Sequence, residues 1–236
     1  MICNADVKSL EVVVAAELSG DEVLIKEIND KVDIHDVNRE RFNLGEGKEA
    51  RRVAKVFKFR LIYGGMFFHN DPDFRHVSTK KAFWDGVVEQ YFDKYKGMRR
   101  WHTELIQTAQ RDGKLTIPSG RFYPFSPLPN GEWPITQIKN YPVQGFGADL
   151  VMLARLETRR RIRESGLPIL LVSTIHDSIV VECPEKHVQE AGKILFESIE
   201  AVPRLCKQVF GYDFRLPMTS EVQYGPNKKN LVDLVL

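Results

Sequence analysis

Two aspartates, Asp6 and Asp177, lie far apart in the sequence, and each follows an apolar run that predicts a buried strand. Between them lies a basic segment with helical periodicity, residues 51–65, which reads RRVAKVFKFRLIYGG. A fold that brings two carboxylates together can hold divalent metal ions, and a cationic helix can hold a triphosphate. The combination predicts phosphoryl or nucleotidyl transfer, which neither aspartate alone would indicate.

The composition indicates a globular protein with a sizeable core. The chain has 236 residues, of which 43% are hydrophobic, and this length suits one large domain or two lobes. The longest apolar stretch, residues 167–175, is too short to cross a bilayer, and the first six residues lack the features of a signal peptide. We therefore expect no membrane partner and a cytoplasmic location.

The cysteines indicate neither a disulfide framework nor a metal site. Cys3, Cys183 and Cys206 form an odd count without CxxC or Cys/His spacing, which predicts reduced thiols rather than a disulfide framework or a zinc site.

Positive charge is clustered, although the net charge of +2 is too small to indicate nucleic-acid binding by itself. The clusters lie at residues 51–60, 99–100 and 155–163. The third fits a solvated helix face that Glu157 and Glu164 partly neutralise, whereas no acid interrupts the first.

Hydrophobic periodicity predicts an α+β chain in which helices separate groups of strands. Strands are expected at residues 1–7, 114–117, 121–125, 169–175 and 179–182, and helices at 9–18, 22–28, 49–62, 79–111, 145–164 and 186–201. Asp177 then occupies a hairpin tip between the last two strands.

The basic helix presents one stripe of functional side chains. Lys55, Phe59 and Tyr63 follow Arg51 at four-residue steps, and each step drifts by only about 40° around an α-helix. The stripe offers two cations for phosphates and an aromatic face for a sugar or base. An amphipathic helix with snorkelling cations would show the same spacing.

Four ordered motifs run through the chain. They are DVKSLE at residues 6–11, R-x3-K-x3-F-x3-YG at 51–64, N-x3-QG-x2-AD at 140–149 and VSTIHDS at 172–178. The first, second and fourth resemble motifs A, B and C of the A-family (DNA polymerase I-like) DNA polymerases, and the third resembles a further segment of that family. The overall impression is of a phage-type member, for which the cytoplasm would be that of the host.

The resemblance implies a right-hand polymerase fold. We expect an antiparallel palm sheet from residues 1–16 and 120–236, with a helical fingers subdomain inserted at 17–119. Because the family carries a thumb and usually an exonuclease domain before motif A, we expect both to be absent from this chain. It would then be a truncated piece, a minimal form, or a subunit that an N-terminal polymerase chain with thumb and exonuclease completes.

The implied activity is template-directed DNA synthesis from dNTPs on a DNA primer–template. Asp6, Asp177 and the backbone carbonyl of Val7 would hold two Mg²⁺ ions, since hard cations prefer oxygen ligands. One ion would activate the primer 3′-hydroxyl, and the other would neutralise the leaving pyrophosphate.

The resemblance also assigns residues to the incoming nucleotide. Arg51 and Lys55 would bind the triphosphate, with Lys55 as the catalytic acid for the leaving group, and His35 would lie near the phosphates. Phe59 would pack against the sugar, and Glu11 would be the steric gate against a ribose 2′-hydroxyl.

Five residues are assigned to DNA. Tyr63 would stack near the templating position, and Gly64 would let the backbone turn closely beneath it. Asn140, Gln144 and His176 would face the primer–template end, where amide donors can test base-pair shape without reading sequence.

The chain departs from the family pattern at four positions. Ser178 stands where a glutamate is usual, which puts a metal role for that position in doubt. Val7 replaces a tyrosine, Ser9 a glutamine and Arg60 a glycine.

Two other classes of function remain open. A palm and fingers subunit, inactive without a thumb-containing partner, would show an exposed apolar palm edge. A metal-dependent phosphohydrolase would use Asp6 and Asp177 but would leave the stripe from Arg51 to Tyr63 unexplained, and it would release nucleotide without primer growth.

Overall fold

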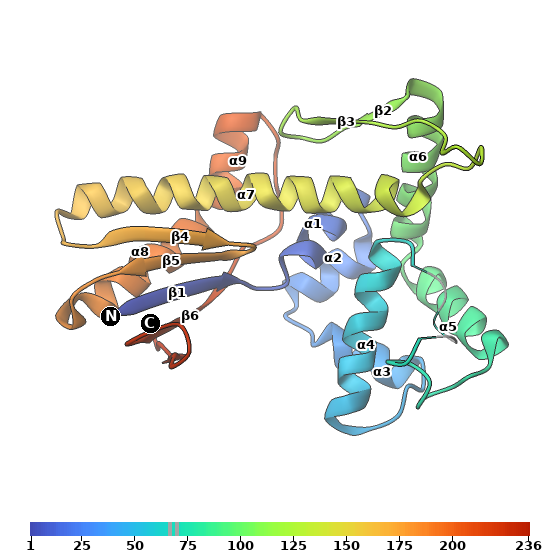
Figure 1. The fold of residues 1–236 in the computed structure, drawn as a ribbon, viewed down its shortest axis with the longest axis horizontal. Helices are drawn as coiled ribbons and strands as arrows, with labels where there is room; N and C mark the ends of the chain where they lie inside the picture. Colours follow the sequence, from blue (N-terminus) through green and yellow to red (C-terminus); the bar gives the residue numbers. More distant parts are fainter. Residues whose placement is uncertain (66–67, 69–70) are drawn as a thin grey trace. The chain divides into compact units, whose positions relative to one another are not determined.

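The computed structural model describes residues 1–65, 68 and 71–236, and the chain divides into two compact units (Figure 1). The sheet unit consists of residues 1–11, 118–120 and 144–236. The helical unit consists of residues 12–117 and 121–143. In the described part of the chain, no helix is both long and apolar enough to span a membrane.

The sheet unit is built on a five-stranded sheet in the order β4-β5-β1-β6-β7. Its strands are β1 (Ile2–Val7), β4 (Leu170–Ile175), β5 (Ser178–Glu182), β6 (Ser220–Gly225) and β7 (Val232–Asp233). All neighbouring strands pair antiparallel, which confirms the α+β fold class and the antiparallel sheet.

Strand β1 lies at the centre of the sheet because its inward side chains are apolar. Cys3, Ala5 and Val7 are almost fully buried, and the Cys3 thiol points toward the carbonyl of Val188 at the start of α8 (Val188–Glu200). Helix α8 packs against β1 and β6. Because side chains alternate along a strand, Asp6 belongs to the opposite face.

Two more helices complete the sheet unit. Helix α7 (Ile135–Ser165) contributes residues to both units, and α9 (Val202–Phe210) follows α8 closely. A 3₁₀ turn, η2 (Glu185–His187), precedes α8.

The helical unit contains α1 to α6 and a small hairpin. The helices are α1 (Leu10–Ser19), α2 (Glu22–Asn29), α3 (Ile34–Arg41), α4 (Gly47–Ile62), α5 (Lys81–Lys94) and α6 (Lys96–Asp112), and the hairpin strands are β2 (Lys114–Thr116) and β3 (Phe122–Pro124). Helix α1 begins with Leu10 and Glu11 in the sheet unit and continues into this one.

An aromatic cluster forms the core of the helical unit. Phe57 of α4 contacts the rings of Phe42, Phe68, Trp84 and Tyr91, with ring centroids 4.7–6.2 Å apart within the cluster. These rings are buried, so the cluster removes a large apolar area from water and fixes one face of α4.

A buried carboxylate joins α2 to α6. Asp21 caps α2 by accepting from the Leu24 N–H at 2.9 Å, and it also accepts from the Met98 N–H at 3.1 Å. The close approach requires Gly97, because a Cβ there would lie 2.6 Å from the Asp21 Cα.

Several elements differ from the sequence prediction. Helix α7 begins at Ile135 rather than near residue 145 and includes Pro142, whose missing N–H removes one helical hydrogen bond without ending the helix. Helix α3 lies between the helices predicted at residues 22–28 and 49–62, where no element was expected, and Asp33 caps it by accepting from the His35 and Asp36 N–H groups. Strands β6 and β7 were not predicted either, because β6 is identified mainly by its pairing with β1.

Candidate active site

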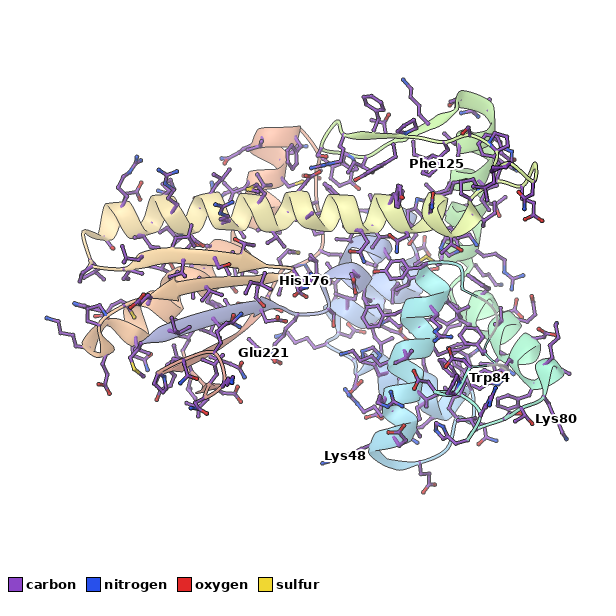
Figure 2. All side chains as sticks on the ribbon, viewed as in Figure 1. Lys48, Lys80, Trp84, Phe125, His176 and Glu221 are labelled. Atoms are coloured by element: carbon purple, nitrogen blue, oxygen red, sulfur yellow. The ribbon has the colours of Figure 1, made fainter. Side chains whose placement is uncertain are left out.

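The structure brings Asp6 and Asp177 together at one end of the sheet. Asp6 is the penultimate residue of β1, and Asp177 lies in the turn between β4 and β5. The Val7 N–H donates to the Asp177 carbonyl oxygen at 3.1 Å, and Asp6 pairs in register with Ser178. His176 enters the turn with a left-handed φ of 55° and is exposed there (Figure 2).

The charge of Asp6 acts on the Asp177 carboxylate. Burial raises the pKa of Asp177 above its ordinary value, and the negative charges of Asp6 and then Glu11 raise it further. His176 opposes this shift. A bound cation would relieve the repulsion between the two carboxylates, as expected at a site built for a metal ion.

Ser178 contacts the Asp6 carboxylate directly. Its hydroxyl donates to Asp6 Oδ2 at 2.7 Å, and the residue is buried at the first position of β5. The position that departs from the family glutamate therefore still touches the aspartate pair.

Glu11 and Gln144, which come from α1 and α7, also meet in the sheet unit. The Gln144 side-chain amide donates to Glu11 Oε1 at 2.7 Å. The two helices also approach closely at Gly147, where an added Cβ would lie 3.4 Å from the Leu10 side chain.

The donor set fits hard cations that share their ligands with a substrate. Within the described residues, no group of three or more His, Cys, Asp or Glu side chains could hold a metal by itself. Two carboxylates with a backbone carbonyl leave coordination positions for water and phosphate oxygens, which is how Mg²⁺ is commonly bound. Asp6, Asp177 and the Val7 carbonyl thus suit such ions better than zinc, which favours sulfur and imidazole ligands.

In the helical unit, α4 presents the expected stripe. Arg51 and Lys55 are exposed, whereas Phe59 and Tyr63 are half-buried. The opposite face of the helix is buried, including Phe57. No ion pair of Lys55 is found in the described part of the chain, so its ammonium is available to a ligand.

Arg51, by contrast, is engaged by acidic groups of the α3 N-terminus. Its guanidinium donates to Asp33 Oδ2 at 2.6 Å and lies 3.6 Å from Asp36. A phosphate that binds Arg51 would therefore compete with Asp33. The sequence did not reveal this contact, since the partners lie on different helices.

His35 joins the stripe because α3 packs against α4. Its ring centroid lies 6.4 Å from that of Phe59. Burial lowers the pKa of His35 to about 4, and the charges of Lys58 and Arg51 contribute, so the ring is neutral at pH 7. Its Nδ1 is buried without a hydrogen-bond partner among the described residues.

Lys58 is a cation that the motif comparison missed. It is almost fully buried on α4, and burial lowers its pKa to about 7. A signal was present, because residue 58 follows Ala54 by one turn and precedes Leu61 on the apolar face of the helix.

Tyr63, Gly64 and Asn140 lie where α4 ends and α7 begins. Tyr63 caps α4, and Gly64 has a left-handed φ of 79°. A Cβ at Gly64 would lie 2.7 Å from the Lys139 side chain, next to Asn140 on α7. The left-handed conformation favours glycine at position 64, whereas the flexible Lys139 side chain could move away from an added Cβ.

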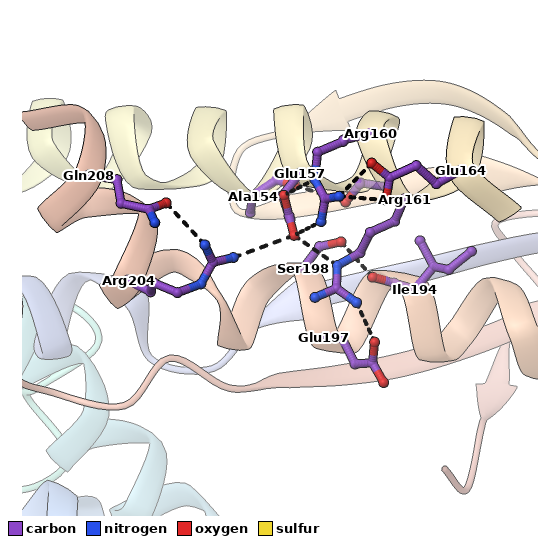
Figure 3. Close-up of polar contacts among 11 residues, drawn as sticks. Ala154, Glu157, Arg160, Arg161, Glu164, Ile194, Glu197, Ser198, Arg204 and Gln208 are labelled. Atoms are coloured by element: carbon purple, nitrogen blue, oxygen red, sulfur yellow. Dashed lines mark hydrogen bonds and ion pairs between the residues drawn. The ribbon is translucent and has the colours of Figure 1, made fainter.

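The third cationic cluster is partly structural (Figure 3). The buried carboxylate of Glu157 accepts from Arg160 at 2.7 Å and from Arg161 at 3.0 Å, and Arg204 of α9 lies 3.7 Å away. Hydrogen bonds from Arg160, then from Arg161, hold the pKa of Glu157 at about 2. A purely solvated face is therefore the wrong interpretation for this part of α7, where Arg204 joins α9 to Glu157 and Arg161 joins α7 to Glu197 of α8.

Comparisons with known proteins agree with this architecture. The family model for DNA polymerase family A matches residues 1–230. DNA polymerase I of Chloroflexus aurantiacus is 28% identical over 240 residues, covering 98% of this chain and 24% of the relative. The thermostable DNA polymerase I of Thermus aquaticus is 30% identical over 239 residues, covering 95% of this chain and 26% of the relative.

A solved structure shares the fold. The POL domain of Pol1 from M. smegmatis, in complex with DNA primer–template and dNTP, matches with a TM-score of 0.79 at 24% identity, covering 95% of this chain and 39% of that one. This chain spans about a quarter of the length of the two curated relatives. Because the family model matches nearly the whole sequence, the chain belongs to DNA polymerase family A.

Proposed function

We propose that this chain catalyses template-directed DNA synthesis, transferring a nucleotide from a dNTP to a primer 3′-hydroxyl by a two-metal mechanism. The observation that carries the proposal is that Asp6 and Asp177 lie together at one end of the sheet. Burial and the neighbouring Asp6 carboxylate raise the pKa of Asp177. The relatives are named DNA polymerase I, and the solved neighbour binds primer–template and dNTP.

Asp6, Asp177 and the Val7 carbonyl would hold two Mg²⁺ ions. When bound, these ions would activate the primer 3′-hydroxyl and neutralise the leaving pyrophosphate. The chain's own contribution is a pair of carboxylates on backbone that hydrogen bonds hold in place, so that little reorganisation is needed when ligands arrive.

The residues of α3 and α4 would bind the nucleotide. Arg51 would exchange Asp33 for a phosphate, and its planar guanidinium can bind two phosphate oxygens at once. Lys55 would supply a second cation and the proton for the leaving group. His35, neutral at pH 7, would donate a hydrogen bond rather than a charge.

Specificity for a deoxynucleotide would come from two side chains. Phe59 would pack against the sugar, and Glu11 would exclude a ribose 2′-hydroxyl. The hydrogen bond from Gln144 restrains the Glu11 carboxylate, and a restrained side chain excludes more sharply than a free one.

Five residues are proposed to contact DNA. Tyr63 would stack near the templating base, where Gly64 turns the backbone. Asn140, Gln144 and His176 would face the primer–template end. All three have side chains that can donate hydrogen bonds to the minor-groove acceptors shared by all base pairs.

The test is primer extension by the purified chain on a short DNA primer–template with Mg²⁺ and dNTPs. Asp177→Asn keeps the side-chain shape and should abolish extension. The matched control is Asp213→Asn, which changes an exposed aspartate of the same unit whose one ion pair among the described residues is with Lys207 at 3.6 Å. Extension that survives Asp177→Asn would contradict the proposal, and so would nucleotide release without primer growth.

A second candidate function is a subunit that needs another polypeptide to act. Its support is apolar surface on the edge strand β4, where Leu170 is 65% and Val172 is 54% exposed. Met152 and Leu156 of α7 are also exposed. An exposed apolar edge strand can pair with a further strand.

The two candidates are separated by the same assay. A subunit would give no extension alone, although circular dichroism shows it folded. Extension would then appear on adding a thumb-containing polypeptide, and Val172→Lys should abolish that rescue without unfolding the chain. Extension by the chain alone would exclude the subunit interpretation.

A further inference from the structure

Asp6 lies between two polar neighbours in the sheet. On one side, Ser178 of β5 pairs with it in register, and on the other side Glu221 of β6 does so. Glu221 is exposed at the start of β6 and lies 3.4 Å from Lys8 (Figure 2). Asp6 therefore has a carboxylate opposite it on β6 and a hydroxyl opposite it on β5.

The Ser178 hydroxyl can donate a hydrogen bond to Asp6, which an ionised carboxylate at this position could not. An ionised carboxylate only accepts hydrogen bonds, whereas a serine hydroxyl can donate. Asp177 and Glu221 already place negative charge around Asp6, and like charges directly opposite in a sheet are destabilising. Ser178 adds a donor to this group without adding charge.

The contact is also well defined. Ser178 is buried, and its Oγ lies 2.7 Å from Asp6 Oδ2. No other hydrogen bond of the Asp6 carboxylate is found within residues 1–65, 68 and 71–236. One oxygen is thus held by the protein, and Oδ1 remains for a ligand.

We propose that Ser178 is a positioning residue for the metal centre, which orients the Asp6 carboxylate by donating to Oδ2 so that Oδ1 faces the ion. This inference rests on the proposed function, because it requires that Asp6 bind a metal. Ser178 stands where the family usually has a glutamate. The inference gives this position a specific role, which is not that of a metal ligand.

The test compares two variants that differ only in the hydroxyl group. Ser178→Thr and Ser178→Val have nearly the same shape and the same β-branching, but only threonine can donate to Asp6. Mn²⁺ binding to the purified chain is titrated without DNA or dNTP, with free Mn²⁺ followed by electron paramagnetic resonance. Thermal melting by circular dichroism compares the folding of both variants.

We expect Ser178→Thr to bind Mn²⁺ within about twofold of wild type, and Ser178→Val to bind roughly 2- to 12-fold more weakly, the range that corresponds to one net hydrogen bond. Equal Mn²⁺ affinities of the two variants would overturn the inference, because packing alone would then explain the position.

Asp177→Asn separates this inference from the proposed function. If wild type and Asp177→Asn bind Mn²⁺ equally, Asp177 does not bind the metal. Both the proposed metal site and the role of Ser178 are then overturned. If Asp177→Asn weakens binding while the threonine and valine variants bind alike, only the role of Ser178 is overturned.

Discussion

The backbone N–H of Val7 donates to the carbonyl oxygen of Asp177 at 3.1 Å, beyond the last strand residue pair that joins β1 to β5. This bond ties the turn that carries Asp177 to the strand that carries Asp6. The main chain therefore fixes where these two residues lie relative to each other. A substitution of either side chain should leave the neighbouring backbone in place, so such variants report on chemistry rather than on folding.

Releasing Arg51 should strengthen nucleotide binding. Asp33→Asn retains a side chain that can cap α3 but removes the ion pair at 2.6 Å. Both partners are partly exposed, so we expect the dNTP dissociation constant to fall by roughly 1.5- to 5-fold. A fluorescent dNTP titration measures this. Asp30→Asn, which removes an exposed pair with Lys26, is the control and should have no effect. Unchanged or weaker binding by Asp33→Asn would show that Arg51 does not contact the nucleotide.

The buried amine of Lys58 should make stability depend on pH. Its folded pKa of about 7 lies below the ordinary 10.5, so between these values the unfolded chain binds the extra proton. Stability should therefore rise with pH from about 7 toward 10, by up to about 1.4 kcal/mol per pH unit from this group. In Lys58→Met this rise in the free energy of unfolding between pH 7 and pH 9 should be absent, as measured by urea unfolding at both pH values. Parallel pH profiles for the two proteins would contradict the assignment.

Glu157 should matter more for stability than its exposed neighbour. Glu157→Gln weakens the contacts with Arg160 and Arg161 inside a buried site, and we expect a loss of about 1–3 kcal/mol in the free energy of unfolding. Glu164→Gln removes a largely exposed partner of Arg160 and should cost less than about 1 kcal/mol. Chemical denaturation at pH 7 compares the two variants, and equal losses would be the contrary result.

The ion pairs of Glu157 should also make the free energy of unfolding depend on pH in the acid range. The folded pKa of Glu157 is about 2, below its ordinary 4.5, so its contribution is present above pH 4.5 and is lost as pH falls toward 2. The difference in unfolding free energy between wild type and Glu157→Gln should therefore shrink over that window. A difference that stays constant from pH 5 to pH 3 would argue against the ion pairs as its cause.

Two glycines should respond to alanine in opposite directions. Gly64→Ala forces an alanine into a left-handed conformation and places Cβ against Lys139, so we expect a loss of about 1–2 kcal/mol. Gly86→Ala lies in α5 with open space around the added Cβ and should gain about 0.5–1 kcal/mol. Thermal melts of both variants test this, and a stabilising Gly64→Ala would contradict the described turn.

Much of the candidate site could be inferred from short segments. Arg51, Lys55, Phe59 and Tyr63 follow from one helical period, and the ends of two apolar runs indicate Asp6 and Asp177. Each of these patterns lies within a few consecutive residues. Local sequence therefore suffices to find these residues, whereas their expected roles come from the resemblance of the four ordered motifs to the family.

Contacts between distant segments could not be inferred in this way. The Ser178 hydroxyl meets Asp6 only because β5 pairs with β1 in one particular register. A shift of β5 by one residue would turn Ser178 to the face of the sheet opposite Asp6. Likewise, the ion pair of Arg51 with Asp33 depends on how α3 packs against α4.

By itself, the sequence determined the kinds of elements, the ordered motifs and the carboxylates and cations that the proposed reaction would use, because these depend on neighbours along the chain. Only the tertiary structure decided that Asp33 forms an ion pair with Arg51 and that Ser178 donates a hydrogen bond to Asp6. Burial, pKa and hydrogen-bond partners are properties of surroundings that segments far apart in the sequence supply, and folding brings those segments together.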